Sequence, residues 1–489
     1  MCALLCIVSC SSDETPYMWV SSDEIRLTYN SGAEAVFSIE TNCSWQISME
    51  GEEAEQVTLS QTSGKGTANI KITTSTQNDT KLQIDLADIY ITNSNDGSSY
   101  TIDLLQRRVP APQTTLMIFT GTSLKTHFNS NITDIKSAIT DGEMGESGRM
   151  LYLMYDTSSR CNLYEIVKEE GATEVTVLTL KSYSNISWND SDTMAQIIED
   201  AKSEAEITSE NGNTINLVLS GHGTGWVLKD HPNLTKLAVA GETTSQYSSS
   251  MWEATSPLYQ MRFMGSATDG FFDIEELQVA IEQSNTKFGY ILFDECFMSS
   301  IELLYRLRNC SDYIIASPTE VMAAGFPYDR IIKYMFDNDG MDFNVEKICE
   351  EYYNSYNESN APYATIAACV TSELEALAAA ISQLDFRDMD DDTRSALQVY
   401  EGLSTHVFYD LGDYVTTCGV GDLTNFYTLF DRAFPPACRL HTTRYYSALG
   451  TYGAKNITTY YGVSTSAPCT AFTDDWGLEP WTIASGLAN

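Results

Sequence analysis

Two stretches of the sequence decide the fold of most of this chain: INLVLSGHGTGW at residues 215–226 and YILFDECFMSS at residues 290–300. Each opens with a nearly continuous apolar run, which is typical of a strand covered on both faces of a sheet. Each run then gives way to a loop of small and polar residues. In open parallel sheets, functional loops leave the carboxyl ends of the strands. The two stretches predict neighbouring parallel strands whose loops share one edge.

The pattern continues on both sides of these strands. Further apolar runs alternate with stretches of helical periodicity, which indicates an α/β domain with a mostly parallel sheet flanked by helices. We assign residues 114–489 to this domain. The additional strands are expected at residues 116–119, 150–155, 175–180 and 313–316, and helices at residues 131–139 and 194–205, the second capped by Asp192 and Thr193.

The shared edge would bring His222 and Cys296 together although they are 74 positions apart (296 − 222). A thiolate is a strong nucleophile, and an adjacent imidazole takes the thiol proton and later delivers it to a leaving amine. The glycines around His222 allow close backbone approach, and the amides of Gly223 and Cys296 would donate hydrogen bonds to an oxyanion. A helix that starts near Ser299 would favour the thiolate further. We therefore predict a His–Cys catalytic pair.

Each of these residues alone has a simpler explanation. A lone cysteine is most often a buried core thiol, and a histidine between glycines can be a turn residue. Their joint occurrence at two strand ends favours catalysis. The other four histidines lack such a setting: His127, His231, His406 and His441.

The two motifs resemble those of the clostripain family of cysteine peptidases. SGHGTGW (220–226) is similar to its histidine motif, and FDECFMSS (293–300) to its cysteine motif, with Glu295 in place of the usual alanine. CSDYIIASPTE (310–320) and DLGDY (410–414) resemble further segments, so that the matches span roughly residues 114–470. The resemblance implies a caspase-like fold, a His–Cys dyad, cleavage after basic residues, and activation by self-cleavage between the two motifs.

The resemblance also assigns residues to the substrate. The family's basic-residue pocket is implied to use Asp294, two positions before the cysteine, and a second acid in a Pro-Gly-Asp-Gly-Trp loop. Here AAGFP (323–327) stands in that place and Ala324 replaces the acid, so that one charge-assisted partner for Arg or Lys is lost. Trp226 and Ser317, which lie in the matched segments, are further expected substrate contacts.

A polar segment lies between the two motifs. Residues 229–270 are serine-rich near their middle and contain several basic residues. Exposed loop tips of this kind are preferred sites of nicking. We expect self-cleavage after Lys236 or Arg262.

Residues 20–108 have a different pattern. Apolar and polar residues alternate with period two in several short runs, which predicts a small all-β sandwich. NCSW (42–45), SGKG (63–66) and the closing Leu105-Gln106 resemble a BACON domain, a family implied to contact glycans or mucins. A spacer that holds the enzyme off a membrane is an equal alternative, since Trp45 fits better as core.

Two short segments complete the predicted organisation. Residues 109–113 contain two prolines and are expected to form an extended linker. IVSC (7–10) resembles the lipobox of a bacterial lipoprotein, although no basic residue precedes it. The resemblance implies lipidation of Cys10, so residues 1–19 are expected to be a signal and tether at the bacterial outer membrane or cell surface. A chance apolar leader is the alternative.

Charge and cysteine usage limit the expected partners. The formal charge of −39 repels phosphate backbones, so a nucleic-acid partner is not expected. None of the 12 cysteines forms a CxxC pair, so no zinc or thioredoxin-like site is expected. We expect no cofactor, and the scattered carboxylates of so acidic a chain leave a calcium site unreadable.

The sequence thus predicts a lipid-anchored cysteine endopeptidase that cuts peptide or protein substrates after Arg or Lys. Two alternatives stay open at this point. One is a non-catalytic surface adhesin with a degenerate peptidase fold, against which the intact His222 and Cys296 argue. The other is an amidase or transpeptidase that uses the same pair.

Overall fold

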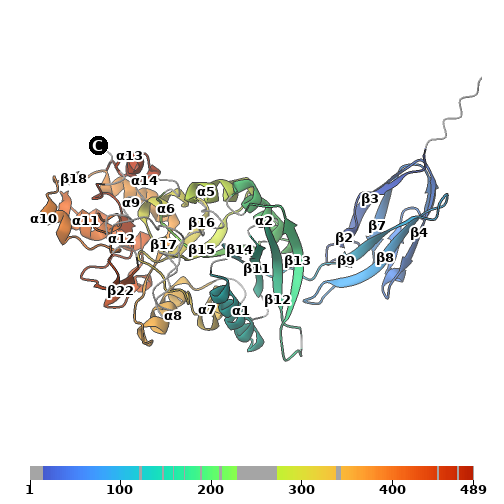
Figure 1. The fold of residues 1–489 in the computed structure, drawn as a ribbon, viewed down its shortest axis with the longest axis horizontal. Coiled ribbons are helices and arrows are strands. Elements are labelled where there is room, and N and C mark those ends of the chain that lie inside the picture. The colour runs from blue at the N-terminus through green and yellow to red at the C-terminus, as the bar shows by residue number, and fades with distance from the viewer. Residues whose placement is uncertain are drawn as a thin grey trace, which may run out of the picture. The chain divides into compact units, whose positions relative to one another are not determined.

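The computed structural model describes residues 15–120, 124–145, 148–157, 159–169, 171–187, 190–208, 212–227, 273–336, 343–448, 451–470 and 473–487. The chain divides into two compact units, with the boundary after Pro110. Figure 1 shows both units and labels many of their elements along the chain. Each unit is described by itself.

The first unit is a sandwich of two sheets. Its strands alternate buried and exposed residues because one face of each sheet packs inward and the other meets solvent. Side chains from both sheets, among them Ile39, Ile70 and Ile89, share one core. The first sheet has the order β1(Met18–Val20), β3(Glu34–Thr41), β7(Ala68–Thr74), β5(Val57–Leu59), and the second has the order β2(Glu24–Leu27), β9(Ser99–Gln106), β8(Ile84–Asn93), β4(Ser44–Glu50), β6(Ser63–Lys65).

Trp45 lies inside this sandwich, as the sequence suggests. The side chain is 1% exposed, and its Nε1 donates a hydrogen bond to Gly66 O over 2.8 Å. Gly64 packs against the ring so closely that a β-carbon there would lie 2.9 Å from Cε2 of the indole. The indole therefore belongs to the core and presents no exposed platform for a sugar.

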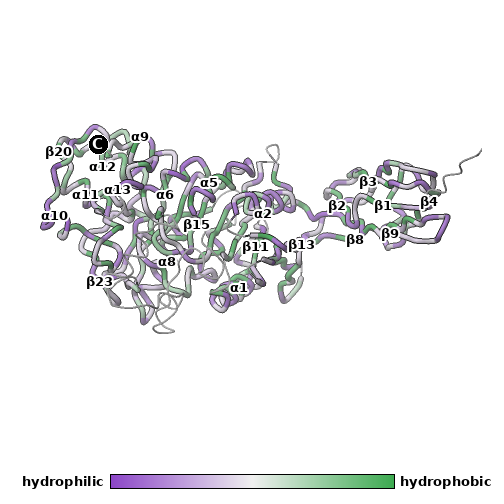
Figure 2. The backbone as a smooth tube through the Cα atoms, turned by 45° about the horizontal axis from the view of Figure 1, so that its top comes forward, coloured by the Kyte–Doolittle hydropathy of each residue, from purple (hydrophilic) through white to green (hydrophobic). Residues whose placement is uncertain are grey.

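The second unit is built on a nine-stranded sheet. Its inner strands pair in parallel, as predicted, and their side chains are almost wholly buried. Figure 2 shows hydrophobic residues gathered along these strands. The strand order is β13(Thr176–Ser184), β12(Arg160–Val167), β11(Gly148–Thr157), β10(Gln113–Phe119), β14(Thr214–Ser220), β15(Phe288–Asp294), β16(Ser311–Ala316), β17(Thr365–Val370), β21(Leu440–His441).

The edges of this sheet depart from the parallel pattern. β12 pairs antiparallel with β11 and β13, and β17 pairs antiparallel with β16 and β21. The sequence pattern did not reveal β12 or β17. Antiparallel neighbours such as β11 and β12 need only a short connection, so no helix separates the two strands. β17 contains two alanines, which are depleted in strands.

Helices cover both faces of the sheet (Figure 1). α1, α7 and α8 pack together, and α2, α5 and α6 form a second group. The helices are α1(Lys125–Thr140), α2(Ser191–Glu204), α5(Ile274–Gln283), α6(Ile301–Arg306), α7(Tyr328–Met335), α8(Val345–Asn357), α9(Leu374–Ile381), α10(Asp391–Ala396), α11(Leu411–Cys418), α12(Thr424–Ala433), α13(Thr473–Trp476) and α14(Pro480–Ala484).

Short elements fill the remaining described parts of the chain. Three pairs of short strands and three 3-10 helices are present. The pairs are β18(Asp385–Phe386) with β20(Gly419–Val420), β19(Tyr409–Asp410) with β24(Ser464–Thr465) and β22(Arg444–Ser447) with β23(Gly453–Asn456), and the 3-10 helices are η1(Ala54–Gln56), η2(Thr371–Glu373) and η3(Pro436–Cys438). None of the helices in the described ranges is long and apolar enough to cross a bilayer.

The start of α2 corrects one expectation. Its cap is Asp190, whose carboxylate accepts a hydrogen bond from Thr193 N over 3.0 Å. The predicted cap at Asp192 and Thr193 was wrong, because Thr193 is the donor to the cap. Asp192 lies in the first turn, where its charge suits the helix dipole.

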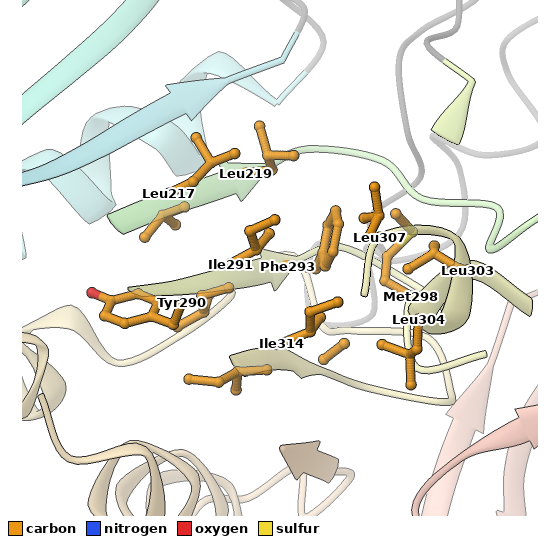
Figure 3. Close-up of a cluster of buried hydrophobic side chains, with 14 of the residues drawn as sticks. Leu217, Leu219, Tyr290, Ile291, Phe293, Met298, Leu303, Leu304, Leu307 and Ile314 are labelled. Carbon is orange, nitrogen blue, oxygen red and sulfur yellow. The ribbon is translucent and has the colours of Figure 1, made fainter. Parts of the chain in front are cut away.

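An apolar core fixes the ends of β14 and β15. Figure 3 shows Phe293, Met298 and Leu303 gathered between β15 and α6. All three side chains are fully buried. Close packing of this kind leaves little room for movement, so the loops that leave these strands start from fixed points.

Candidate active site

The carboxyl ends of β14 and β15 lie side by side. The strands pair in parallel with Ser220 opposite Asp294, and Gly221 N donates to Asp294 O over 3.3 Å. His222 and Cys296 each follow this pair by two residues. Both are buried, with His222 6% exposed and Cys296 0% exposed. The two loops start from one edge of the sheet, as the sequence predicts.

The two loops touch at Gly223. A β-carbon at this position would overlap the carbonyl oxygen of Cys296 and would lie 2.8 Å from Met298 Sδ. Gly221 is confined in the same way by the side chain of Thr120. A larger residue at either glycine would push apart the segments that meet here.

The side chain of Cys296 faces the segment that follows β16. Its Sγ accepts a hydrogen bond from Val321 N over 3.2 Å and lies 3.8 Å from Val321 O, to which the thiol can donate. The next residue, Phe297, has a φ of +62°. This conformation is rare for a bulky residue, and such residues gather at functional sites. Phe297 N donates to Thr319 O over 3.0 Å, which holds the turn in place.

Asp294 ends β15 as a fully buried carboxylate. Its Oδ2 accepts hydrogen bonds from Ser220 Oγ over 3.1 Å and from Tyr328 OH over 2.9 Å. Ser220 ends β14 and Tyr328 begins α7. These two bonds hold the carboxylate in one orientation, two residues before Cys296 in the chain.

Trp226 and Ser317, the other expected substrate contacts, are both buried. Trp226 Nε1 donates to Ser466 Oγ over 2.8 Å. Ser317 Oγ donates to Thr319 O over 3.1 Å and lies 2.8 Å from Thr365 Oγ1. Both side chains therefore bond to residues inside the unit.

Ala324, the residue that replaces the expected second acid, is exposed. Its carbonyl oxygen accepts a hydrogen bond from Asn131 Nδ2 over 2.9 Å, which fixes the loop to α1. The next residue, Gly325, has a φ of +73°, and its carbonyl accepts a hydrogen bond from Tyr356 OH over 2.7 Å. The loop has a defined shape although it lacks the acidic side chain.

A third segment, residues 401–408, contacts the same two loops. The sequence pattern did not mark this segment. The ring of Phe408 stacks on the ring of Phe297, with centroids 4.9 Å apart and planes 12° apart. Phe408 also confines Gly225, where φ is +65° and a β-carbon would lie 3.0 Å from Phe408 Cε1. Sequence reasoning missed this contact because Phe408 is far from both loops along the chain.

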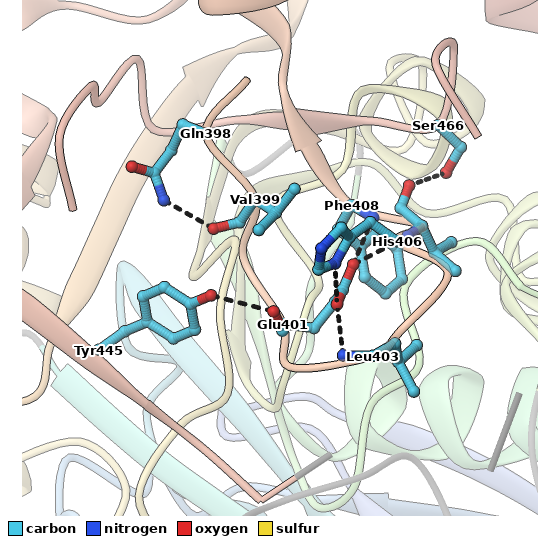
Figure 4. Close-up of polar contacts among 9 residues, drawn as sticks. Gln398, Val399, Glu401, Leu403, His406, Phe408, Tyr445 and Ser466 are labelled. Atoms are coloured by element: carbon cyan, nitrogen blue, oxygen red, sulfur yellow. Dashed lines mark hydrogen bonds and ion pairs between the residues drawn. The ribbon is translucent and has the colours of Figure 1, made fainter. Parts of the chain in front are cut away.

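Glu401 shapes this third segment (Figure 4). Its buried carboxylate accepts hydrogen bonds from Leu403 N and Val407 N, each over 2.8 Å, and pairs with His406 Nδ1 at 2.9 Å. Burial acts to lower the pKa of His406, but the hydrogen bond and the charge of Glu401 outweigh it and raise this pKa above its ordinary value. His406 therefore serves as a partner of Glu401.

Three site predictions fall outside the described residues: Cys10, Lys236 and Arg262. Within the ranges that the structure describes, no group of three or more His, Cys, Asp or Glu side chains is placed to hold a metal ion.

Comparison of the sequence with protein families gives a match over the part of the chain that carries Cys296. The model of the clostripain family matches residues 250–462, a stretch that contains Cys296 and begins after His222. No curated protein matches the chain.

Solved structures of bacterial proteases share the fold. A secreted C11 cysteine protease from Bacteroides thetaiotaomicron is 27% identical, with a TM-score of 0.65, and the match covers 77% of this chain and 100% of that one. An inactive zymogen of a C11 protease from Parabacteroides distasonis is 24% identical, with a TM-score of 0.60 over 77% of this chain and 99% of that one. A secreted C11 protease from B. thetaiotaomicron, bound to an irreversible peptide inhibitor, is 22% identical, with a TM-score of 0.58 and the same two coverages, 77% and 99%.

Proposed function

This chain belongs to the clostripain family of cysteine peptidases, and from that premise we propose that His222 and Cys296 are its catalytic pair. The observation that carries the proposal is the pairing of Ser220 with Asp294, because it starts both loops at one edge of the sheet. The contact of Gly223 with the carbonyl of Cys296 supports it.

In the proposed reaction, the thiolate of Cys296 attacks the carbonyl carbon of the scissile bond after His222 has taken the thiol proton. The C–N bond then breaks as the imidazolium gives that proton to the leaving amine. Water, activated by the neutral imidazole, hydrolyses the thioester and restores the thiol. The amides of Gly223 and Cys296 are the proposed donors to the oxyanion.

The proposed substrates have Arg or Lys before the scissile bond. Asp294 supports this preference because it is a buried carboxylate, two residues before the nucleophile, whose orientation is set by Ser220 and Tyr328. A carboxylate in such surroundings binds a guanidinium or ammonium more strongly than one in water. Trp226 and Ser317 are proposed to support the walls of the substrate site from within, since their polar atoms already bond to neighbours.

The placement of the enzyme is proposed from its sequence motifs. Lipidation of Cys10 would tether it to the bacterial surface, with the BACON-like sandwich as a spacer or as a contact to glycans or mucins. Self-cleavage after Lys236 or Arg262 would precede activity. A relative that is described as secreted is in keeping with export. Cys10→Ala should release the protein from the membrane fraction, and unchanged membrane association would contradict the tether.

A peptide library tests the activity itself. Wild type should generate new termini after Arg or Lys, while folded Cys296→Ala and His222→Ala should each lose about 10⁴-fold or more in rate. Near-normal turnover in either variant would refute the pair. Release of ammonia, or transfer of the acyl group to an added amine in place of hydrolysis, would instead indicate an amidase or a transpeptidase on the same pair.

A further inference from the structure

Glu302 is a buried carboxylate that lies close to the proposed nucleophile along the chain. It belongs to α6, the helix that follows the Cys296 loop, and it is fully buried. Its Oε1 accepts hydrogen bonds from Thr465 Oγ1 over 2.9 Å, Ser466 N over 2.9 Å and Trp476 Nε1 over 2.8 Å. Burial raises the pKa of Glu302. Removal of a carboxylate from water costs free energy. We therefore expect a carboxylate in this part of the core to have a role that offsets this cost.

Ser466 connects Glu302 to the histidine loop. Ser466 Oγ accepts a hydrogen bond from Trp226 Nε1 over 2.8 Å. The same hydroxyl donates one to Val407 O over 2.8 Å (Figure 4). Trp226 is the fourth residue after His222 in the same loop. A continuous path of hydrogen bonds therefore runs from α6 through Glu302 and Ser466 to the loop that carries the proposed base.

Segment 462–466, which contains Ser466, also binds the cysteine loop. Ser464 N donates to Ser299 O over 2.9 Å, and Ser299 Oγ donates to Gly462 O over 2.8 Å. Ser300 and Ser464 form a parallel bridge between the two backbones. The segment 462–466 is thus attached to the loop of the proposed nucleophile at one end and to the loop of the proposed base at the other.

We propose that Glu302 is a positioning residue that fixes segment 462–466. Through Ser466 and Trp226, Glu302 then sets where His222 lies relative to Cys296. This inference rests on the proposed function, because it assumes that these two residues react together. Displacement of a catalytic group by about 1 Å can cost about 100-fold in rate. Three directed hydrogen bonds to one carboxylate oxygen limit such displacement.

The test compares variants that break the path with one that spares it. Ser466→Ala and Trp226→Phe each remove the bond between the segment and the histidine loop, and each should lower kcat about 10- to 100-fold, with little change in KM for Ser466→Ala. Because they break the same bond, the double variant should be no slower than the slower single variant. Glu302→Ala should lower kcat at least as much, and Glu302→Gln should recover part of the loss, since its carbonyl oxygen can still accept.

Trp476→Phe is the matched control. It removes one hydrogen bond to the same Oε1 but leaves the bonds of Ser466 in place, so kcat should stay within about twofold even if the melting temperature falls. A second readout is the pH profile of Cys296 alkylation by iodoacetamide, which follows the position of the imidazole. Ser466→Ala should shift this profile and Trp476→Phe should not.

Two results would overturn the inference. One is an equal loss of kcat in Ser466→Ala and Trp476→Phe, which would mean that kcat follows stability alone. The other is a double variant whose loss is the product of the single losses. Failure of the catalytic pair has a separate signature, because Cys296→Ala would then hydrolyse peptide at the wild-type rate.

Discussion

The backbone of Gly223 lies directly against the carbonyl oxygen of Cys296, with no room for a β-carbon between them. Gly223→Ala should therefore push the histidine loop away from the cysteine loop. We expect kcat/KM for peptide hydrolysis to fall about 100-fold, the loss typical of a 1 Å displacement. Steady-state kinetics with a fluorogenic peptide measure this loss.

Gly64→Ala is the control for this substitution. A β-carbon at Gly64 would collide with the ring of Trp45 to a similar degree, but in the first unit. This variant should lower the stability of the sandwich and leave hydrolysis unchanged. Wild-type activity in Gly223→Ala would show that the contact between the two loops has no part in catalysis.

Asp294→Asn should weaken cleavage after Arg or Lys. The amide can still accept a hydrogen bond from Ser220 or Tyr328 but carries no charge for a basic side chain. Loss of one partner of a buried charge pair costs about 2–5 kcal/mol, measured as the change in kcat/KM for basic peptides. Alkylation of Cys296 by a small neutral reagent should change far less. An equal loss for basic and apolar peptides would remove Asp294 from the specificity site.

Ala324→Asp probes the same preference in the opposite direction. The position is exposed and its backbone is fixed to Asn131, so that an acid can be added without repacking. If this loop lines the pocket, the selectivity for Arg and Lys over apolar residues should rise. Unchanged selectivity in a peptide library would mean that the loop does not reach the substrate.

Asp410 should make the stability of the second unit depend on pH. It caps α11 through Asp413 N over 2.8 Å and accepts hydrogen bonds from Tyr461 N over 2.7 Å and from Tyr400 OH. Burial raises the pKa of Asp410 to about 7. Its contribution is therefore fully present below about pH 4 and is lost as pH rises through about 7. Relative to Asp410→Asn, wild type should lose on the order of 2–4 kcal/mol of unfolding free energy across that range.

Asp422→Asn is the control, because Asp422 should make the unfolding free energy depend on pH in the opposite direction. The hydrogen bonds from the side chain and backbone of Thr424 lower the pKa of Asp422. Its contribution should therefore be present at neutral pH and be lost as pH falls below about 4. Denaturant titrations of both variants from pH 3 to pH 9 compare the slopes. A difference between wild type and Asp410→Asn that does not vary with pH would contradict the account of Asp410.

The first unit should be dispensable for hydrolysis of small peptides. It has its own core around Ile39, Ile70 and Ile89, and the boundary between the two units along the chain lies after Pro110. A chain that begins at Ala111 should hydrolyse a short peptide with kcat/KM within about twofold of wild type, because a separate core folds independently. A loss of more than about tenfold would mean that the sandwich supports the active site.

The sequence predicted those features that depend on residues near one another along the chain. The apolar runs before His222 and Cys296 marked buried strands, and parallel pairing explains why their loops meet. Antiparallel β12 and alanine-containing β17 lacked that signal. The contacts of Ser466 with Trp226 and of Phe408 with Phe297 join residues that are far apart in sequence and of common types, so only the fold reveals them.

Labelling of thiols tests the central claim most directly. Wild type is treated with an alkylating peptide that ends in Arg or Lys, and mass spectrometry locates the label. The account predicts modification at Cys296, because the bound peptide brings the reagent to this thiol and His222 removes its proton, and a labelling rate that falls about 10²–10⁴-fold in His222→Ala. Labelling at another cysteine with loss of activity, or an unchanged rate in His222→Ala, would contradict the proposed pair.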